Sequence, residues 1–195
     1  MVLFSYRCVN RQIYDYALHS VVVLCHFSRK GFSMISLPQI VRDCGGCTAC
    51  CKTHIGVEMK LKGGDYCDHC QIGEGCSIYE QRPFACKVYR CVWVCGAGEE
   101  GDRPDRLKVV MDLKAINFRG SKVAAVHFWE VEDGAAQQPR VQSYMVSNVE
   151  AGNVAVLCPF EGKPVFYFPQ GMFSDEDQQL FIEAWKNDRG ALFSK

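Results

Sequence analysis

The sequence predicts an α+β protein, in which a cysteine-rich, metal-bound module of loops and short helices precedes an antiparallel β meander and a C-terminal helix. Two observations lead to this prediction. Ten of the 13 cysteines lie between residues 44 and 95, and a succession of strand-like apolar runs follows residue 106. The chain of 195 residues is long enough for one domain or two small ones, and its 48% hydrophobic residues exclude a largely disordered protein.

Residues 1–33 show no clear periodicity, and we expect them to be a translation-start artefact or a dispensable extension before Met34. Their weak apolar run, 17–27, is interrupted by two histidines and a serine, so it lacks the pattern of a secretory signal. It is also too short to span a bilayer, which takes about 20 apolar residues. We therefore expect a cytoplasmic protein with reduced thiols and no membrane partner.

The predicted metal module covers residues 34–95, and its first motif is Cys44-Gly45-Gly46-Cys47-Thr48-Ala49-Cys50-Cys51. A C-x2-C spacing allows two thiolates to reach one metal from a tight turn, and the two glycines permit the backbone geometry of such a turn. Because Cys51 directly follows Cys50, their side chains diverge. One of these two cysteines is therefore expected to serve a different ligand set or a different metal.

Two kinds of metal centre fit the cysteine spacing. A second C-x2-C pair, Cys67 and Cys70, follows the first motif after about 16 residues, which matches zinc-ribbon spacing. The first motif also reproduces three positions of a bacterial ferredoxin run, but His54 stands where that run has its fourth cysteine. The cofactor is therefore zinc or an iron–sulfur cluster, with zinc preferred. A thiol–disulfide role for Cys67 and Cys70 is disfavoured because no βαβ pattern surrounds them.

A downstream motif, Cys76-Ser77-Ile78-Tyr79-Glu80-Gln81-Arg82-Pro83-Phe84-Ala85-Cys86, gives the chain a resemblance to a known family. Together with the upstream Cys-x2-Cys-x2-Cys-Cys run, it resembles the YkgJ-type CxxCxxCC family of zinc- or iron-chelating domain proteins over about residues 35–95. The resemblance implies a metal module rather than a particular reaction. The metal ligands it implies are Cys44, Cys47, Cys50, Cys51, Cys76 and Cys86, with Cys67 as the usual intervening cysteine and with Cys70 and Cys91 as weaker matches.

The other residues of the second motif have physical interpretations of their own. Residues 77–81 are expected to form a helical turn, which Pro83 ends by disfavouring helical geometry at Arg82. Arg82 either offsets thiolate charge or holds the fold together. Cys158 lies in an apolar run and is expected to be a core thiol, whereas Cys95 fits either a ligand or a core thiol.

The sequence outside the cysteine motifs predicts the strands and turns that support the metal module. Residues 55–62 alternate in polarity and predict a half-buried strand between the cysteine groups. The polar, Gly-rich stretch 96–106 predicts a loop before the meander of 107–195, with turns at 150–153 and 161–163. The expected strands are Leu107–Leu113, Lys122–Val131, Arg140–Val149, Val154–Cys158 and Pro164–Phe168.

The chain is expected to close with a helix that begins after Ser174 as N-cap and ends before Gly190. Its predicted apolar stripe consists of Leu180, Phe181, Ala184 and Trp185, and this stripe should pack on the sheet. We expect the meander and its helix to pack on the module as one domain. His127 lies within a predicted strand, and we expect it to be a structural residue rather than a catalytic base.

The charge balance and the lack of common enzyme motifs limit the classes of function that the sequence supports. Lys plus Arg and Asp plus Glu number 22 each, and residues 44–95 contain six basic and five acidic side chains, which makes a nucleic-acid partner unlikely. Phosphate loops, nucleotide fingerprints and serine-hydrolase elbows are absent, so no catalytic residue is predicted. We expect a metal-binding protein with a structural role as an adaptor for another protein. The alternative is an iron–sulfur or iron-dependent redox protein or enzyme.

Overall fold

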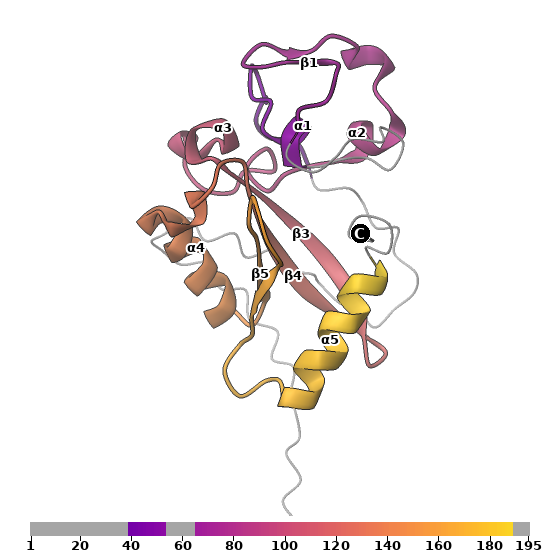
Figure 1. Cartoon of the computed structure of the whole chain (residues 1–195), viewed down its shortest axis with the longest axis vertical. Helices are drawn as coiled ribbons and strands as arrows, with labels where there is room; N and C mark the ends of the chain where they lie inside the picture. Colours follow the sequence, from indigo (N-terminus) through magenta and orange to yellow (C-terminus); the bar gives the residue numbers. More distant parts are fainter. Residues whose placement is uncertain (1–38, 54–64, 189–195) are drawn as a thin grey trace, which may run out of the picture.

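The computed structural model describes residues 39–53 and 65–188. It contains a cysteine cap, which we define as residues 39–53 and 65–95, and a four-stranded sheet flanked by helices (Figure 1). The predicted α+β class is confirmed. None of the helices in the described ranges is long and apolar enough to cross a membrane. The predictions for residues 1–33, for the strand at 55–62 and for His54 and Gly190 fall outside these ranges.

The cap contains only short elements, whereas the rest of the chain forms longer ones. The elements of the cap are α1 (Cys50–Thr53), β1 (Cys70–Gln71), β2 (Gly75–Cys76), the 3-10 turn η2 (Tyr79–Gln81) and α2 (Phe84–Val88). After the cap come η3 (Glu100–Asp102), α3 (Pro104–Leu107), β3 (Val109–Phe118), β4 (Ser121–Glu130), η4 (Ala135–Gln137), α4 (Pro139–Glu150), β5 (Val154–Cys158), β6 (Val165–Tyr167) and α5 (Asp175–Asp188).

The main sheet is mixed, with the strand order β3-β4-β5-β6. β3 and β4 form a long antiparallel hairpin, in which Val109 lies opposite Glu130 and Phe118 opposite Ser121. β5 pairs with β4 in parallel, and β6 pairs with β5 antiparallel across the predicted turn at 161–163. The predicted antiparallel meander is therefore wrong at one strand pair.

The cause is residues 140–149, which form α4 instead of the predicted strand. Val141, Tyr144 and Met145 are buried at helical spacing, and Pro139 occupies the first turn, where its missing N–H is tolerated. The β-branched and aromatic residues of this segment favoured the strand prediction, but their spacing fits a helix. Because α4 carries the chain from the end of β4 back to the start of β5, the two strands run in parallel.

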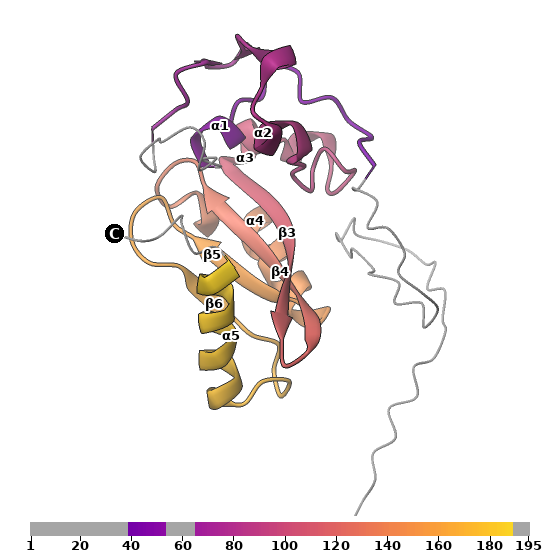
Figure 2. The same ribbon diagram turned by 90° about the vertical axis from the view of Figure 1, so that its right-hand side faces the viewer.

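The two long helices cover opposite faces of the sheet (Figures 1 and 2). On one face, the helix residues Val141, Tyr144 and Met145 pack in a cluster with Val109, Met111, Val126, Phe128 and Ala155. On the other face, Phe181 and Trp185 pack with Ile116, Ala125, Val154, Val156 and Cys158. Burial on both faces explains why β5 is a continuous apolar run rather than an alternating one.

The C-terminal helix follows the prediction in most respects. The Ser174 hydroxyl accepts a hydrogen bond from the backbone N–H of Asp177 at 3.1 Å, so Ser174 caps the first turn. Phe181 and Trp185 are buried and Ala184 packs beside them. Leu180 was expected in the same stripe, but it is 39% exposed because it lies at the edge of the buried face.

His127 lies in a strand, β4, as expected, and it belongs to a buried polar chain. The Trp185 indole N–H donates to His127 Nε2 at 2.8 Å, and His127 Nδ1 lies 2.6 Å from the Asp112 carboxylate. An indole nitrogen can only donate, so Nε2 must accept and the imidazole proton must sit on Nδ1. The chain from Asp112 to Trp185 therefore fixes α5 on the sheet through satisfied polar groups.

The stretch 96–106 was expected to be a polar loop, but it contains η3 and α3. The reason is Asp102, a buried carboxylate that accepts hydrogen bonds from the Arg140 guanidinium at 2.7 and 3.0 Å, from the Tyr144 hydroxyl and from the Glu99 backbone N–H at 2.7 Å. Burial alone would raise the pKa of Asp102, but the hydrogen bonds from Arg140, Tyr144 and Glu99 lower it to about 2, against 3.8 for an ordinary aspartate. Asp102 therefore ties this stretch to α4.

We predict that Asp102→Asn lowers the free energy of unfolding by about 2 kcal/mol at pH 7, because the buried donors lose a charged acceptor. Urea denaturation measures the change. The matched control is Glu132→Gln, which breaks the exposed ion pair with Lys108 and should change stability by less than about 0.5 kcal/mol.

The same variant should reveal a pH dependence. Because the folded pKa of Asp102 lies below its unfolded value, its stabilising contribution is complete above about pH 5 and is lost as the pH falls toward about 2. The stability difference between wild type and Asp102→Asn should therefore shrink over this range. A difference that stays constant from pH 5 to pH 2 would show that the charge of Asp102 contributes nothing.

Candidate metal centre

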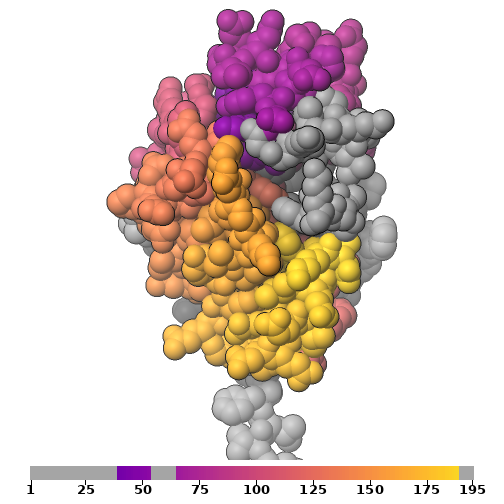
Figure 3. Space-filling model, viewed as in Figure 1, coloured from indigo at the N-terminus to yellow at the C-terminus, as the bar shows by residue number. Residues whose placement is uncertain are grey.

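The cysteine cap sits on one end of the sheet, next to the start of β3 and the end of β4 (Figures 1 and 3). Trp93 and Val94 of the cap form an apolar cluster with Val110 and Val131 of the sheet region. The Lys52 ammonium group also donates to the Val131 carbonyl at 2.7 Å. These contacts attach the cap to a rigid platform.

The first motif begins with the tight turn that the sequence predicts. The Cys47 N–H donates to the Cys44 carbonyl at 3.0 Å, and Gly45 has a φ of +52°, a conformation that glycine adopts without strain. Gly46 is needed for a different reason. A Cβ atom at Gly46 would lie 2.2 Å from the Gly73 carbonyl oxygen, so the backbone can approach this closely only without a side chain. The turn therefore packs directly against the loop between β1 and β2.

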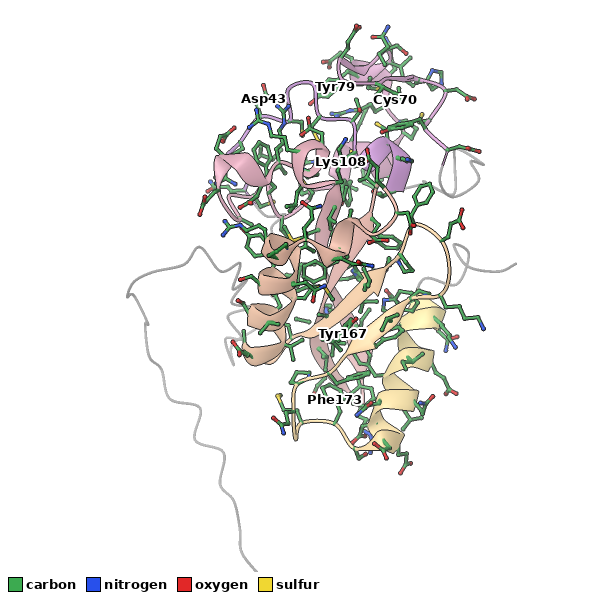
Figure 4. All side chains as sticks on the ribbon, turned by 60° about the vertical axis from the view of Figure 1, so that its left-hand side comes forward. Asp43, Cys70, Tyr79, Lys108, Tyr167 and Phe173 are labelled. Carbon is green, nitrogen blue, oxygen red and sulfur yellow. The ribbon has the colours of Figure 1, made fainter. Side chains whose placement is uncertain are left out.

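Backbone contacts bring a second group of cysteines together. The Cys67 N–H donates to the Cys51 carbonyl at 3.1 Å, and the Cys70 N–H donates to the Cys67 carbonyl at 2.8 Å. Cys70 and Cys76 then lie opposite each other in the β1–β2 pair. Figure 4 shows Cys70 in the cap together with Asp43 and Tyr79, beyond Lys108 and far from Tyr167 and Phe173.

Cys91 and Cys95 flank a tight loop that lies beside the first motif. The backbone N–H of Val41 donates to the Val94 carbonyl at 3.0 Å. The Arg42 guanidinium donates to the carbonyls of Trp93 and Ala97 at 3.1 and 2.7 Å, and it also stacks on the Trp93 ring. Because Arg42 lies two residues before Cys44, these bonds hold the Cys44–Cys47 turn next to the loop 91–95.

Burial disfavours the thiolate form of several cap cysteines. The ten cysteines of the cap are free thiols. Burial raises the pKa of Cys91 to about 12, and negative charge on Cys44, Cys47 and Cys95 acts in the same direction. Burial also raises the pKa of Cys86, and negative charge on Cys51, Cys67 and Cys76 raises it further. Burial raises the pKa of Cys70 to about 11, and the charge of Cys51 contributes to this rise.

The nine predicted ligands therefore share one cap, but they do not form a finished coordination sphere. No three His, Cys, Asp or Glu side chains of the described ranges are arranged as a metal site. His69 is exposed, and its carbonyl, rather than its ring, accepts a hydrogen bond from Ser77 at 2.9 Å. Metal binding would require the thiol side chains to turn toward one another on a backbone that already brings them near.

Arg82 lies among these thiols. Its guanidinium stacks on the Tyr79 ring at 3.6 Å, and its positive charge acts to lower the pKa values of Cys44, Cys51 and Cys86. Its Nε–H is buried and has no hydrogen-bond partner in the described part of the chain. A buried donor of this kind needs an acceptor, and a thiolate sulfur of a metal centre would supply one. The donor set of the cap thus fits a metal–thiolate centre. The expected helical turn at 77–81 is present as η2 at 79–81, and Arg82 after it has an extended ψ of 145° before Pro83, as expected.

Comparison with known proteins does not identify the chain: no protein-family model, no curated protein and no solved structure matches it. The resemblance to the CxxCxxCC family stays a prediction.

Sequence reasoning missed two features of the cap. The first is the position of Cys95, which packs in the same cluster as Cys47 and Cys91. The C-x3-C spacing from Cys91 is the signal that could have placed it. The second is the Arg42 contact, for which the sequence gives no signal because it depends on a distant loop. Cys158 is 3% exposed in the sheet core, as expected of a core thiol.

We predict that Gly46→Ala lowers the free energy of unfolding by about 2 kcal/mol, because the overlap with the Gly73 carbonyl can be relieved only by moving backbone. Gly101→Ala is the matched control, since a Cβ there would meet nothing within 4 Å. Thermal denaturation of both variants measures the difference. Equal stabilities would contradict the close approach of the turn to the β1–β2 loop.

Proposed function

We propose that the protein binds metal through the thiolates of its cysteine cap, and that the metal has a structural role in an adaptor for another protein. The observation that carries this proposal is the gathering of ten free thiols, from segments separated by up to 51 positions in the chain, at one end of the molecule. Zinc is the proposed metal, because structural zinc sites use tetrahedral sets of cysteine thiolates.

The energetics of the cap support a metal. Between residues 65 and 90 no residue is buried, and α1 and α2, of four and five residues, bury none. Helices this short and a two-stranded ribbon are not stable in water on their own. In structural zinc sites the binding free energy is folding free energy, so metal binding would supply the stability that apolar burial does not.

The charges of the cap also favour a thiolate centre. A zinc ion with four thiolates has a formal charge of −2, which nearby cations stabilise. The positive charges of Arg82, Arg90 and Arg103 all act on Cys44. Arg82 acts on Cys51 and Cys86 as well, so the cations are distributed over the cap.

A four-thiolate zinc site does no chemistry of its own, and this is why we propose an adaptor role. The metal would hold the outer surface of the cap in one shape, on which Ile72, Tyr79 and Phe84 are 65%, 53% and 73% exposed. Exposed apolar side chains of this kind suit a protein partner. We place the protein in the cytoplasm, where thiols stay reduced and available for metal.

Metal analysis of the full chain, purified under reducing and oxygen-poor conditions, tests the proposal. We expect a colourless protein with at least one zinc ion per chain, because zinc is d10. A brown protein with stoichiometric iron and sulfide would replace zinc by an iron–sulfur cluster and favour the redox alternative. Much less than one metal ion per chain would contradict metal binding altogether.

We further predict that Cys70→Ser lowers the metal content and disorders the cap, because it removes one ligand without removing buried apolar area. The near-UV circular dichroism of the cap aromatics and the metal content should decrease together. Cys158→Ser is the control: its thiol lies in the sheet core, so the metal content should not change. A Cys70→Ser protein with full metal content would show that Cys70 is not a ligand.

A further inference from the structure

We propose that the cap holds two separate metal sites, and that one of them consists of Cys44, Cys47, Cys91 and Cys95 and takes a single thiophilic divalent ion such as Zn²⁺. This inference rests on the proposed metal-binding function and divides it between two centres. It adds Cys95, which the motif of the first subsection does not contain. It also separates the first two cysteines of that motif from the last two.

The geometry of the inner site comes from two short turns held side by side. Cys44 and Cys47 are joined by a backbone hydrogen bond of 3.0 Å, and the Cys95 N–H donates to the Val92 carbonyl at 3.2 Å. The bonds from Val41 and Arg42 to the loop 91–98 keep these turns together. C-x2-C and C-x3-C pairs on two adjacent turns are a typical way to supply four thiolates to one ion.

Packing supports the same grouping. Cys47, Cys91 and Cys95 all belong to the apolar cluster that contains Trp93 and Val110, at the junction between cap and sheet. The thiols whose negative charge raises the pKa of Cys91 are Cys44, Cys47 and Cys95, the other members of the proposed site. An ion bound here would therefore be shielded from water on the side of the sheet.

The remaining cap thiols form the outer group. Cys51, Cys67, Cys70 and Cys76 are joined by backbone hydrogen bonds and by the β1–β2 register. Cys86, in α2, is also a cap thiol outside the inner site. Cys50 directly precedes Cys51 in the chain and is the sixth of these thiols. Six cap thiols therefore lie outside the inner site, and four of them are enough to bind a second ion.

Arginines surround the inner site. The positive charges of Arg82, Arg90 and Arg103 act on Cys44, and that of Arg90 acts on Cys95. A Cβ at Gly45 would lie 3.5 Å from the Arg103 guanidinium, so this cation lies directly beside the turn. Arg103 also forms an ion pair with Asp105 at 2.7 Å, and the charges of Arg82 and Arg90 balance the formal charge of −2 on a tetrathiolate zinc ion.

The test is the zinc content of the reduced full chain and of variants in each group. Wild type should bind two zinc ions. Cys95→Ser should bind one, and so should a variant with Cys67→Ser, Cys70→Ser and Cys76→Ser, which leaves only three thiols in the outer group. A variant that combines all four substitutions should bind none. Cys158→Ser should retain both ions. Cys95→His, which keeps a zinc ligand at this position, should restore the ion that Cys95→Ser loses.

Three outcomes would overturn the inference. Full zinc content in Cys95→Ser would exclude Cys95 as a ligand. A combined variant that loses no more zinc than Cys95→Ser or the outer-group variant alone would show one shared centre, with the proposed function intact. Wild type without zinc, iron or another metal would contradict the proposed function itself and the two-site inference with it.

A second measurement uses wild-type protein alone, so it does not depend on how the variants fold. Zinc should slow the alkylation of Cys44 and Cys95 by iodoacetamide at least about tenfold, as read by mass spectrometry, because a bound thiolate is not free to react. Equal alkylation rates of Cys95 with and without zinc would contradict the inner site.

Discussion

The cysteine cap contains too little apolar area to fold by burial, and the rest of the proposed function follows from this constraint. Its only buried residues in the described ranges are Thr48 and Ala49 and the run from Cys91 to Val94. Ala49 and the run 91–94 pack at the junction with the sheet or in the core beneath it, and Thr48 accepts a hydrogen bond from the Gly73 N–H within the cap. The outer part of the cap must therefore be stabilised by another kind of bond, and free thiols offer metal coordination.

The sheet contains the buried apolar contacts that the cap lacks. With α4 on one face and α5 on the other, β3 and β4 are rigid, and the cap is attached to the end of this hairpin through Val110 and Val131 (Figure 2). The Asp112–His127–Trp185 chain and the Asp102 cluster anchor the two helices through buried, satisfied polar groups. A metal centre at the cap would thus be held against a platform that does not itself depend on metal.

Local patterns predicted most of the chain, and they failed where long-range contacts decide. The C-x2-C turn, the β3–β4 hairpin and the capped helix after Ser174 depend on residues close in sequence, and the structure contains all three. Residues 140–149 were misjudged because their β-branched side chains suit a strand, although the spacing of Val141 and Tyr144 fits a helix. The hydrogen bond from Tyr144 to Asp102, 42 positions away, had no signal in the sequence. The role of Cys95 was open because contacts of Val41 and Arg42 with a loop distant in sequence place Cys95 beside Cys44.

X-ray absorption at the zinc edge of the metal-loaded full chain tests the central claim most directly, since it reports which atoms bind the metal. Coordination by cysteine thiolates predicts a first shell of sulfur alone, with about four sulfur atoms per zinc ion at about 2.3 Å. A shell dominated by nitrogen or oxygen at about 2.0 to 2.1 Å would contradict the account, because the cap would then not bind metal through its thiols.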